Sequence, residues 1–350
     1  MASYDAVVVG AGLSGAVMAR QLAEEGGWRV LVVEGKSHIA GHCYDSATAD
    51  GIYLHHYGPH IFHTDNRSVY TYLSRFCHWR PYRHRVLAEV DRRLIPLPFN
   101  LNSLEILYPR AEAERLVQRL LHHYGDGQRI SILELRQSGE PQLGELAERI
   151  YQKLFRGYSR KQWGLDPDLL SAEVIARVPL VVSRDDDYFA DQWQGIPVSG
   201  YSKMVEKILD HPLLECRLNT AMSSLIELNI ETGVCLLEDK AFAGQIIYTG
   251  MVDALFGYCY GVLPYRTLRL ETQRIAQSEQ EVAVVNYPQR FSYTRTTQFG
   301  HFVDSVGGGD LLMREYPEPF IPGLREGEIP FYPVFTDQNR DLFSRYEQLA

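Results

Sequence analysis

Three glycines and one glutamate near the N-terminus have the types and spacing that bind a dinucleotide. Gly10, Gly12 and Gly15 follow a short apolar run, and Glu34 closes a second apolar run, VLVVE. In such a turn the first glycine makes the bend, the second lets the backbone approach the pyrophosphate, and the third lets helix and strand pack closely. The exposed amides and the dipole of the following helix favour negative charge.

The acid at Glu34 narrows the choice of nucleotide. Its carboxylate would accept hydrogen bonds from ribose hydroxyls, whereas the extra phosphate of NADP would need an arginine at this place. Leu13 and Ser14 stand at the start of the helix that faces the pyrophosphate. FAD and NAD remain as candidates.

A histidine-rich segment at 51–64, GIYLHHYGPHIFHT, raises the question of a metal site. Some of its histidines have spacings that would suit zinc on one face of a helix. Gly58 and Pro59 interrupt any helix between them. We therefore expect no metal at the four histidines His55, His56, His60 and His63.

The composition is that of an ordinary globular protein with room for two or three domains. The 350 residues are 45% hydrophobic and 23% charged, and the formal net charge is −9. Nucleic acid and anionic membranes favour basic surfaces, so neither is expected as the main partner. An anionic substrate would need a local cluster of arginines.

The cysteines indicate a reducing compartment. There are 5, an odd number, and none forms a CxxC pair, which argues against a disulfide framework or a zinc site. The sequence shows neither a signal peptide nor eighteen consecutive apolar residues. We expect a cytoplasmic protein without a membrane span.

The elements that must position these residues indicate an α/β protein. The strand, helix and strand at 5–34 are typical of a Rossmann-like domain, and the apolar run at 245–249 could return to its sheet. Helical periodicity dominates 103–163, with Ser103 and Ser131 as capping candidates. Short alternating runs between 265 and 334 predict a separate antiparallel sheet.

Several longer motifs make a resemblance specific. In chain order they are YGPHIFHT at 57–64, LPFNLN at 97–102, FRGYSRKQWG at 155–164, YRTL at 265–268, YTR at 293–295 and REYP at 314–317. With these motifs the whole chain resembles the bacterial UDP-galactopyranose mutase family.

The resemblance implies a flavoenzyme that interconverts UDP-galactopyranose and UDP-galactofuranose without net redox change, supplying galactofuranose for cell-surface polysaccharide. N5 of reduced FAD attacks the anomeric carbon, UDP leaves, and the sugar ring opens and recloses through another hydroxyl. The cofactor supplies the nucleophile while the protein orients it and retains the diphosphate. A homodimer is expected.

The same resemblance assigns roles to individual residues at the substrate. Arg177 and Arg295 would grip the diphosphate, because a planar guanidinium can bind phosphate oxygens in pairs. Phe155 and Tyr158 would meet the uracil, and Trp163 would lie on a mobile lid near the sugar. The hydroxyls expected to bind phosphate are those of Tyr188 and Tyr316.

The flavin is expected beside the histidine loop, with His63 nearest N5 and acting in catalysis with Arg177 and Arg295. Arg266 is a supporting residue next to the active site. The full set of expected cofactor contacts is Gly10, Gly12, Leu13, Ser14, Gly15, Glu34, Gly41, His42, His60, Ile61, His63 and Arg266.

The resemblance also predicts three domains. Residues 1–82, 198–260 and 331–350 would form a discontinuous FAD-binding domain, truncated at its C-terminal end. Residues 83–175 would form a helical domain with the lid, and residues 176–197 with 261–330 the antiparallel sheet domain.

The sequence departs from the family in two places. Ala40 replaces one glycine of a pair, which is tolerable if the backbone there needs no positive φ. The family continues beyond residue 350 with a strand and helix that contact the flavin and the sugar diphosphate. Two alternatives therefore stay open: a flavin-dependent oxidase or dehydrogenase of the amine-oxidase type, and a paralogue that binds a nucleotide sugar without flavin.

Overall fold

A parallel sheet forms around the glycine turn and confirms the predicted Rossmann-like unit. Its strand order is β12-β2-β1-β16, and Ala6 of β1 pairs with Val30 on one side and with Gln245 on the other. The apolar run at 245–249 thus returns to the first sheet, as predicted. The elements are β1 (Ala6–Val9), α1 (Leu13–Gly26), β2 (Val30–Val33), β12 (Leu214–Arg217) and β16 (Gln245–Tyr248).

Small side chains let helix α1 lie close to this sheet. Ala19 packs in one apolar cluster with side chains of β1 and β2, and Ala16 and Ala23 are also buried. The helix ends at Gly27, whose φ of 66° closes the last turn through a hydrogen bond to the carbonyl of Leu22. The glycine turn is therefore held at the N-terminal end of a well-packed helix.

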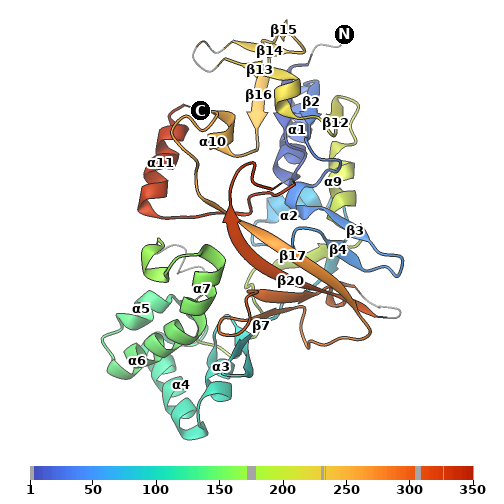
Figure 1. Ribbon diagram of the computed structural model, residues 1–350. Coiled ribbons are helices and arrows are strands. Elements are labelled where there is room, and N and C mark those ends of the chain that lie inside the picture. The colour runs from blue at the N-terminus through green and yellow to red at the C-terminus, as the bar shows by residue number, and fades with distance from the viewer. Residues whose placement is uncertain are drawn as a thin grey trace.

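Two long antiparallel strands dominate the second sheet, as Figure 1 shows below the parallel sheet. β17 and β20 pair along their whole lengths, from Tyr265 opposite Phe320 to Ile275 opposite Asp310. The seven strands run in the order β21-β17-β20-β19-β18-β7-β8. They are β7 (Val86–Val90), β8 (Arg93–Leu97), β17 (Tyr265–Ile275), β18 (Val284–Asn286), β19 (Arg295–Gln298), β20 (Asp310–Phe320) and β21 (Tyr332–Pro333).

Helices between the first strands of this sheet and residue 163 form a lobe beside it (Figure 1). Ser131 caps α5 as predicted, whereas Asn100 caps α3 and Ser103 completes the capping box from inside the helix. One large apolar cluster joins these helices to β7 and β8. The elements are α3 (Leu101–Leu107), α4 (Arg110–Tyr124), α5 (Ile132–Arg136), α6 (Pro141–Ile150), the π-helical η2 (Tyr151–Phe155) and α7 (Arg156–Trp163).

Smaller elements complete the chain. The strands β5, β11 and β6 form one small sheet and β13, β14 and β15 another. The remaining helices and strands are α2 (Arg67–Leu73), α9 (Tyr201–Leu209), α10 (Val252–Leu255), α11 (Asp337–Glu347), β3 (Asp45–Ala47), β4 (Tyr53–His55), β5 (Phe62–Thr64), β6 (Trp79–Pro81), β9 (Arg129–Ile130), β10 (Leu180–Val181), β11 (Trp193–Pro197), β13 (Ile226–Leu228), β14 (Cys235–Leu237) and β15 (Lys240–Ala241).

Two segments belong to the seven-stranded sheet although the predicted domain boundaries place them in other domains. β7 and β8 fall in the range assigned to the helical domain, and β21 falls in the range assigned to the FAD-binding domain, yet all three join the seven-stranded sheet. Among the described residues, no helix combines the length and apolar character needed to cross a bilayer. The computed structural model describes residues 4–171, 179–229, 232, 234–303, 309–325 and 327–349.

Candidate active site

The glycine turn leaves no room for side chains where β1 meets α1. Gly10 has a φ of +105°, and a Cβ added to it would lie 2.2 Å from the hydroxyl oxygen of Thr249. A Cβ on Gly15 would lie 1.9 Å from the carbonyl oxygen of Gly10. Both glycines are therefore required by the fold, as the sequence predicts.

Glu34 is fixed by backbone amides at the mouth of this turn. Its Oε2 accepts a hydrogen bond from the Ala11 amide at 2.9 Å, and its Oε1 accepts one from the Lys36 amide at 2.9 Å. Each oxygen keeps a further lone pair for another donor. The carboxylate thus lies at the end of β2, where a ribose hydroxyl is expected to bind.

A cavity of about 700 Å³ opens in front of the turn and has the size of a cofactor pocket. Eight of the predicted cofactor residues line it, and they are Gly10, Gly12, Leu13, Ser14, Gly15, Glu34, Gly41 and His42. Other parts of the wall come from Thr249, Tyr265 and Phe331. Four predicted contacts, His60, Ile61, His63 and Arg266, are not part of this lining.

A left-handed backbone forms the wall opposite the turn. Ala40 has a φ of 72° and Gly41 a φ of 53°, and Ala40 bridges to Gly12. The expectation that alanine is tolerated here required a backbone without positive φ, and Ala40 does not meet it. A left-handed residue with a Cβ costs about 1–2 kcal/mol. The methyl group is buried, which offsets part of this cost.

His42 presents a neutral ring to the cavity. It stacks on Phe331 with ring centroids 5.0 Å apart. Burial, with smaller contributions from Lys36 and His60, lowers the pKa of His42 to about 4. At neutral pH the imidazole is therefore uncharged and offers a flat surface to a cofactor.

Arg266 binds the end of helix α7 and does not face the dinucleotide cavity. Its Nε donates to the carbonyl of Gln162 at 3.0 Å, and its Nη2 donates to those of Lys161 at 3.3 Å and Pro317 at 3.0 Å. Burial lowers the pKa of this guanidinium, which nevertheless stays charged. A cation at the C-terminus of a helix also complements the helix dipole.

Replacing Arg266 by alanine should therefore loosen α7 and lower the free energy of unfolding by about 2–3 kcal/mol. Urea unfolding of the wild type, Arg266→Ala and Arg266→Lys measures the effect. The lysine variant should lie between the other two, because one ammonium cannot replace the guanidinium fork. Equal stability of the alanine variant and the wild type would refute this role.

A row of polar side chains crosses three strands of the large sheet. Asn286 on β18 is paired with Arg295 on β19, and Arg295 is paired with Glu315 on β20. Directly paired residues point to the same face of a sheet. Arg295 donates from Nε to Glu315 Oε2 at 2.7 Å. Burial is the largest single influence and opposes the charge on Arg295, but Glu315 together with Tyr158 and Tyr332 raises the pKa of this guanidinium well above its ordinary value.

Three phenols lie close enough to Arg295 to feel its charge. They are Tyr158, Tyr188 and Tyr332. Burial raises the pKa of each, so all three hydroxyls remain donors at neutral pH. Tyr332 receives a hydrogen bond from Arg295 Nη2 at 3.3 Å, and its ring meets Trp163 at 6.0 Å. The structure thus brings the predicted Tyr158, Trp163, Tyr188 and Arg295 together.

Tyr316 lies on the other face of the sheet. Neighbouring residues of a strand point to opposite faces, and Glu315 already faces Arg295. The Tyr316 ring instead lies under the guanidinium of Arg269, 4.0 Å from its centre, and touches Tyr293. Tyr332 and Asn286, which the sequence analysis did not name, occupy the Arg295 face. The Oδ1 of Asn286 is buried without a partner among the described residues.

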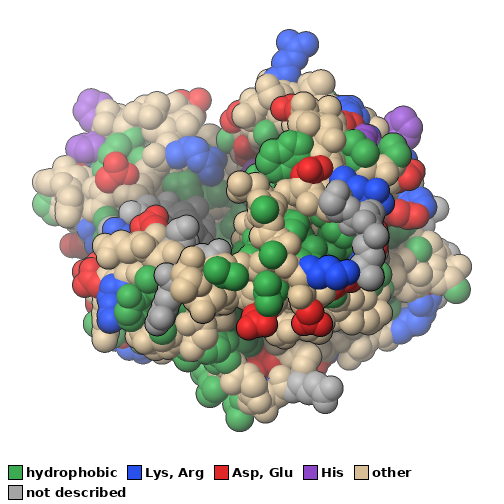
Figure 2. Space-filling view, turned by 90° about the horizontal axis from the view of Figure 1, so that it is seen from above, with side chains coloured by type: hydrophobic (Ala, Val, Ile, Leu, Met, Phe, Trp, Pro, Cys, Tyr) green, Lys and Arg blue, Asp and Glu red, His purple; other side chains and the backbone are tan. Residues whose placement is uncertain are grey.

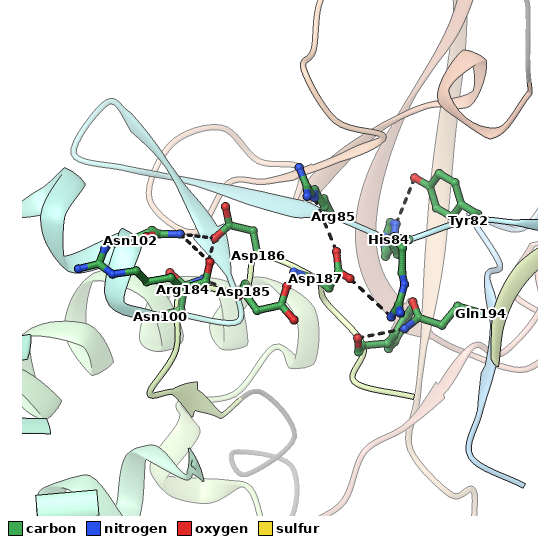
Figure 3. A network of polar contacts seen from close by, with 12 residues as sticks. Tyr82, His84, Arg85, Asn100, Asn102, Arg184, Asp185, Asp186, Asp187 and Gln194 are labelled. Atoms are coloured by element: carbon green, nitrogen blue, oxygen red, sulfur yellow. Dashed lines mark hydrogen bonds and ion pairs between the residues drawn. The ribbon is translucent and has the colours of Figure 1, made fainter. Parts of the chain in front are cut away.

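The segment that carries Tyr188 is tied to the rest of the molecule by its acidic residues, as Figure 3 shows. Asp186 Oδ1 accepts hydrogen bonds from Asn100 at 2.8 Å and from Asn102 at 2.9 Å. Asp187 lies 3.7 Å from Arg85, and the Tyr188 amide donates to the His84 carbonyl at 2.8 Å. These carboxylates therefore anchor a loop.

The two histidines predicted at the flavin are separated. His63 is exposed on β5, bonds to Asp191 at 3.0 Å and stacks on Phe189 at 3.6 Å. It lines a separate cavity of about 300 Å³ together with Tyr188. His60 lies between the two halves of the site. A charge on His60 would lower the pKa of His42, and the charge of Arg295 lowers the pKa of His60.

The remaining predicted residues have different surroundings. Ile61 and Phe155 pack against the main apolar cluster. Arg177 lies outside the described residues. Seen from above, the surface is hollowed between two lobes, and acidic and basic side chains are interspersed over this face (Figure 2).

The dinucleotide cavity and the Arg295 cluster are adjacent. Phe331 belongs to the wall of the cavity, and the next residue, Tyr332, bonds to Arg295. One site could therefore hold a dinucleotide at the glycine turn and an anionic group at Arg295.

Comparisons with known proteins agree with this geometry. A model of the UDP-galactopyranose mutase family matches residues 153–350, and a model of NAD(P)-binding Rossmann-like domains matches residues 8–76. The chain resembles a solved structure titled "Crystal structure of reduced UDP-Galactopyranose mutase" with a TM-score of 0.71 and 17% identity, covering 99% of this chain and 88% of that one. This likeness confirms the fold.

Curated relatives are similar over the whole chain. A "Probable UDP-galactopyranose mutase" of Klebsiella pneumoniae is 34% identical, with 100% of this chain and 86% of the relative covered. A UDP-galactopyranose mutase of Mycoplasma pneumoniae is 32% identical, with coverages of 99% and 88%. A dTDP-fucopyranose mutase of Escherichia coli is also 32% identical, with coverages of 98% and 88%.

Proposed function

The chain belongs to the UDP-galactopyranose mutase family of isomerases, and we propose that it interconverts UDP-galactopyranose and UDP-galactofuranose with FAD as its cofactor. The observation that carries this proposal is the position of Arg295. A guanidinium with three phenolic donors stands next to a cavity built for a dinucleotide. A mutase of this kind needs a cofactor and a nucleoside diphosphate in one site.

The residues of the cavity fit a flavin dinucleotide. The N-cap residue Gly12 provides no side chain to cap the first amides of helix α1, which suits a pyrophosphate there. Glu34 offers acceptors for ribose hydroxyls, and the neutral His42 ring gives a flat wall. When bound in its reduced form, FAD supplies a nucleophilic nitrogen, N5, for the anomeric carbon and undergoes no net oxidation. The family matches favour this reading over the amine-oxidase alternative.

The Arg295 cluster would hold the diphosphate while its bond to the sugar breaks. A guanidinium binds phosphate oxygens in pairs, and Tyr158, Tyr188 and Tyr332 can each donate to a further oxygen. The negative charge on the leaving diphosphate grows during this step, so preformed donors stabilise the transition state. Trp163, in contact with Tyr332, would cover the sugar side.

The test is to incubate the protein with UDP-galactofuranose, with the flavin either reduced or oxidised, and to separate the products. We expect conversion to the pyranose only after reduction and without stoichiometric hydride transfer. Consumption of oxygen or NAD in the presence of an amine would instead support the oxidase alternative. UDP-sugar binding by a protein without flavin would support the non-catalytic one.

A second candidate function has one observation in its favour, the 32% identity to a dTDP-fucopyranose mutase. That identity equals the one to the Mycoplasma mutase. Both nucleotide sugars carry a diphosphate that Arg295 could bind. Assaying dTDP-fucofuranose beside UDP-galactofuranose distinguishes the two, and we expect a higher kcat/KM for the UDP sugar. A cytoplasmic homodimer that supplies galactofuranose for polysaccharide is the physiological setting that we propose.

A further inference from the structure

Glu315 is a fully buried carboxylate at the centre of the proposed site. Its side chain is 0% exposed, and its Oε2 accepts the hydrogen bond from Arg295 Nε. The other oxygen, Oε1, has no partner among the described residues. A buried acceptor without a partner is destabilising, and a buried ion pair is weak evidence for stability. Stability alone therefore does not account for an acid at this position.

The geometry of the pair determines which nitrogens of Arg295 remain available. Glu315 engages Nε, the inner nitrogen of the guanidinium, and leaves the terminal nitrogens Nη1 and Nη2 for other partners. Nη2 already reaches Tyr332. A bidentate phosphate contact needs two nitrogens in one fixed plane. The carboxylate therefore fixes the plane of the fork and leaves its outer edge for a phosphate group.

Gly58 lies on the far side of the carboxylate from Arg295. A Cβ added to Gly58 would be in ordinary van der Waals contact with Glu315 Oε1, at 3.6 Å, and the φ of +90° at Gly58 favours glycine. The histidine loop thus lies beside the carboxylate and offers Oε1 no hydrogen-bond partner among the described residues.

We propose that Glu315 is a positioning residue that fixes the fork of Arg295 for the substrate diphosphate and partly neutralises it, so that UDP is oriented without being bound too tightly. This inference rests on the proposed function. Arg295 makes the contact with phosphate, and Glu315 acts only through Arg295.

Two substitutions separate the hydrogen bond from the charge. In Glu315→Gln the amide oxygen can still accept from Nε, whereas Glu315→Leu removes the acceptor. We expect kcat to stay within about threefold of wild type in the glutamine variant and to fall about 10- to 100-fold in the leucine variant. Both variants lose the negative charge, so UDP should bind about three- to tenfold tighter to each by calorimetry.

A purely structural role would give another pattern, in which kcat, UDP affinity and melting temperature fall together in both variants. That pattern, or wild-type kcat in Glu315→Leu, would overturn the proposal. Should the leucine variant not fold, Glu315→Asp replaces it, because a carboxylate shorter by one methylene cannot reach Nε. Its kcat should then fall at least tenfold, and an unchanged kcat would equally overturn the proposal.

Failure of the proposed function would be recognised separately. A wild-type protein that binds UDP but converts neither nucleotide sugar would refute the mutase activity. The calorimetric comparison needs no turnover, so tighter UDP binding by Glu315→Gln would still support the coupling to Arg295. Weaker UDP binding by that variant would refute it.

Discussion

An Arg295→Ala variant should lose about 10²- to 10³-fold in kcat on the nucleotide sugar, the usual effect of removing one donor that stabilises growing charge. The charge of the guanidinium acts on three phenolic donors, and no hydroxyl can replace its two parallel hydrogen bonds. UDP affinity should fall as well, because the same contact holds the diphosphate before the bond breaks. Steady-state kinetics and calorimetry with UDP measure the two effects.

Stability must be separated from chemistry in this experiment. Removing Arg295 leaves Glu315 as an unpaired buried charge, which typically costs 3–5 kcal/mol. The double variant Arg295→Ala, Glu315→Gln removes both charges and should recover most of that stability without recovering activity. Full activity in the double variant would show that the guanidinium has no role in the reaction.

The dinucleotide half of the site could be predicted from the sequence because its chemistry is local. Three glycines, a strand, a helix and Glu34 lie within one continuous βαβ unit, and backbone geometry alone dictates where they stand. The strand predicted at 245–249 lies at the edge of the same sheet, beside β1, and its residues are half-buried or exposed.

The substrate half depends on contacts between distant strands, which no local pattern specifies. Tyr316 and Tyr332 are both tyrosines near the C-terminus, and only the register of β19 and β20 shows that Tyr316 points away from Arg295. The sequence REYP did contain a signal, because neighbouring residues of a strand point to opposite faces of the sheet. If Glu315 faces an arginine, Tyr316 points to the other face. Asn286 carried no such signal, since its role depends on its pairing with Arg295.

The left-handed backbone at Ala40 could not be predicted from the alanine itself, because alanine has no preference for that conformation. The glycine that the family carries at this position was the one available signal. β7 and β8 fall within the predicted helical domain, residues 83–175, yet β7 pairs in parallel with β18, about two hundred residues later, and no local pattern specifies a pairing between such distant segments.

A Gly15→Ala variant should lose most of its flavin. The added Cβ would lie 1.9 Å from the Gly10 carbonyl oxygen and 3.1 Å from its carbon. These are backbone atoms of the turn itself, so α1 must move away from β1 and carry the amides at its N-terminus with it. Overpacking of this kind costs about 1–3 kcal/mol, and each 1.4 kcal/mol lost from binding is a tenfold change in affinity.

We therefore expect FAD affinity to fall about 10- to 100-fold, measured by titrating the apoprotein with FAD and following flavin fluorescence. Gly144→Ala is the matched control, because Gly144 lies within α6 and the nearest atom to an added Cβ is 3.9 Å away. That variant should keep wild-type affinity and gain up to about 1 kcal/mol of stability. Undiminished FAD binding by Gly15→Ala would mean that the glycine turn does not hold the cofactor.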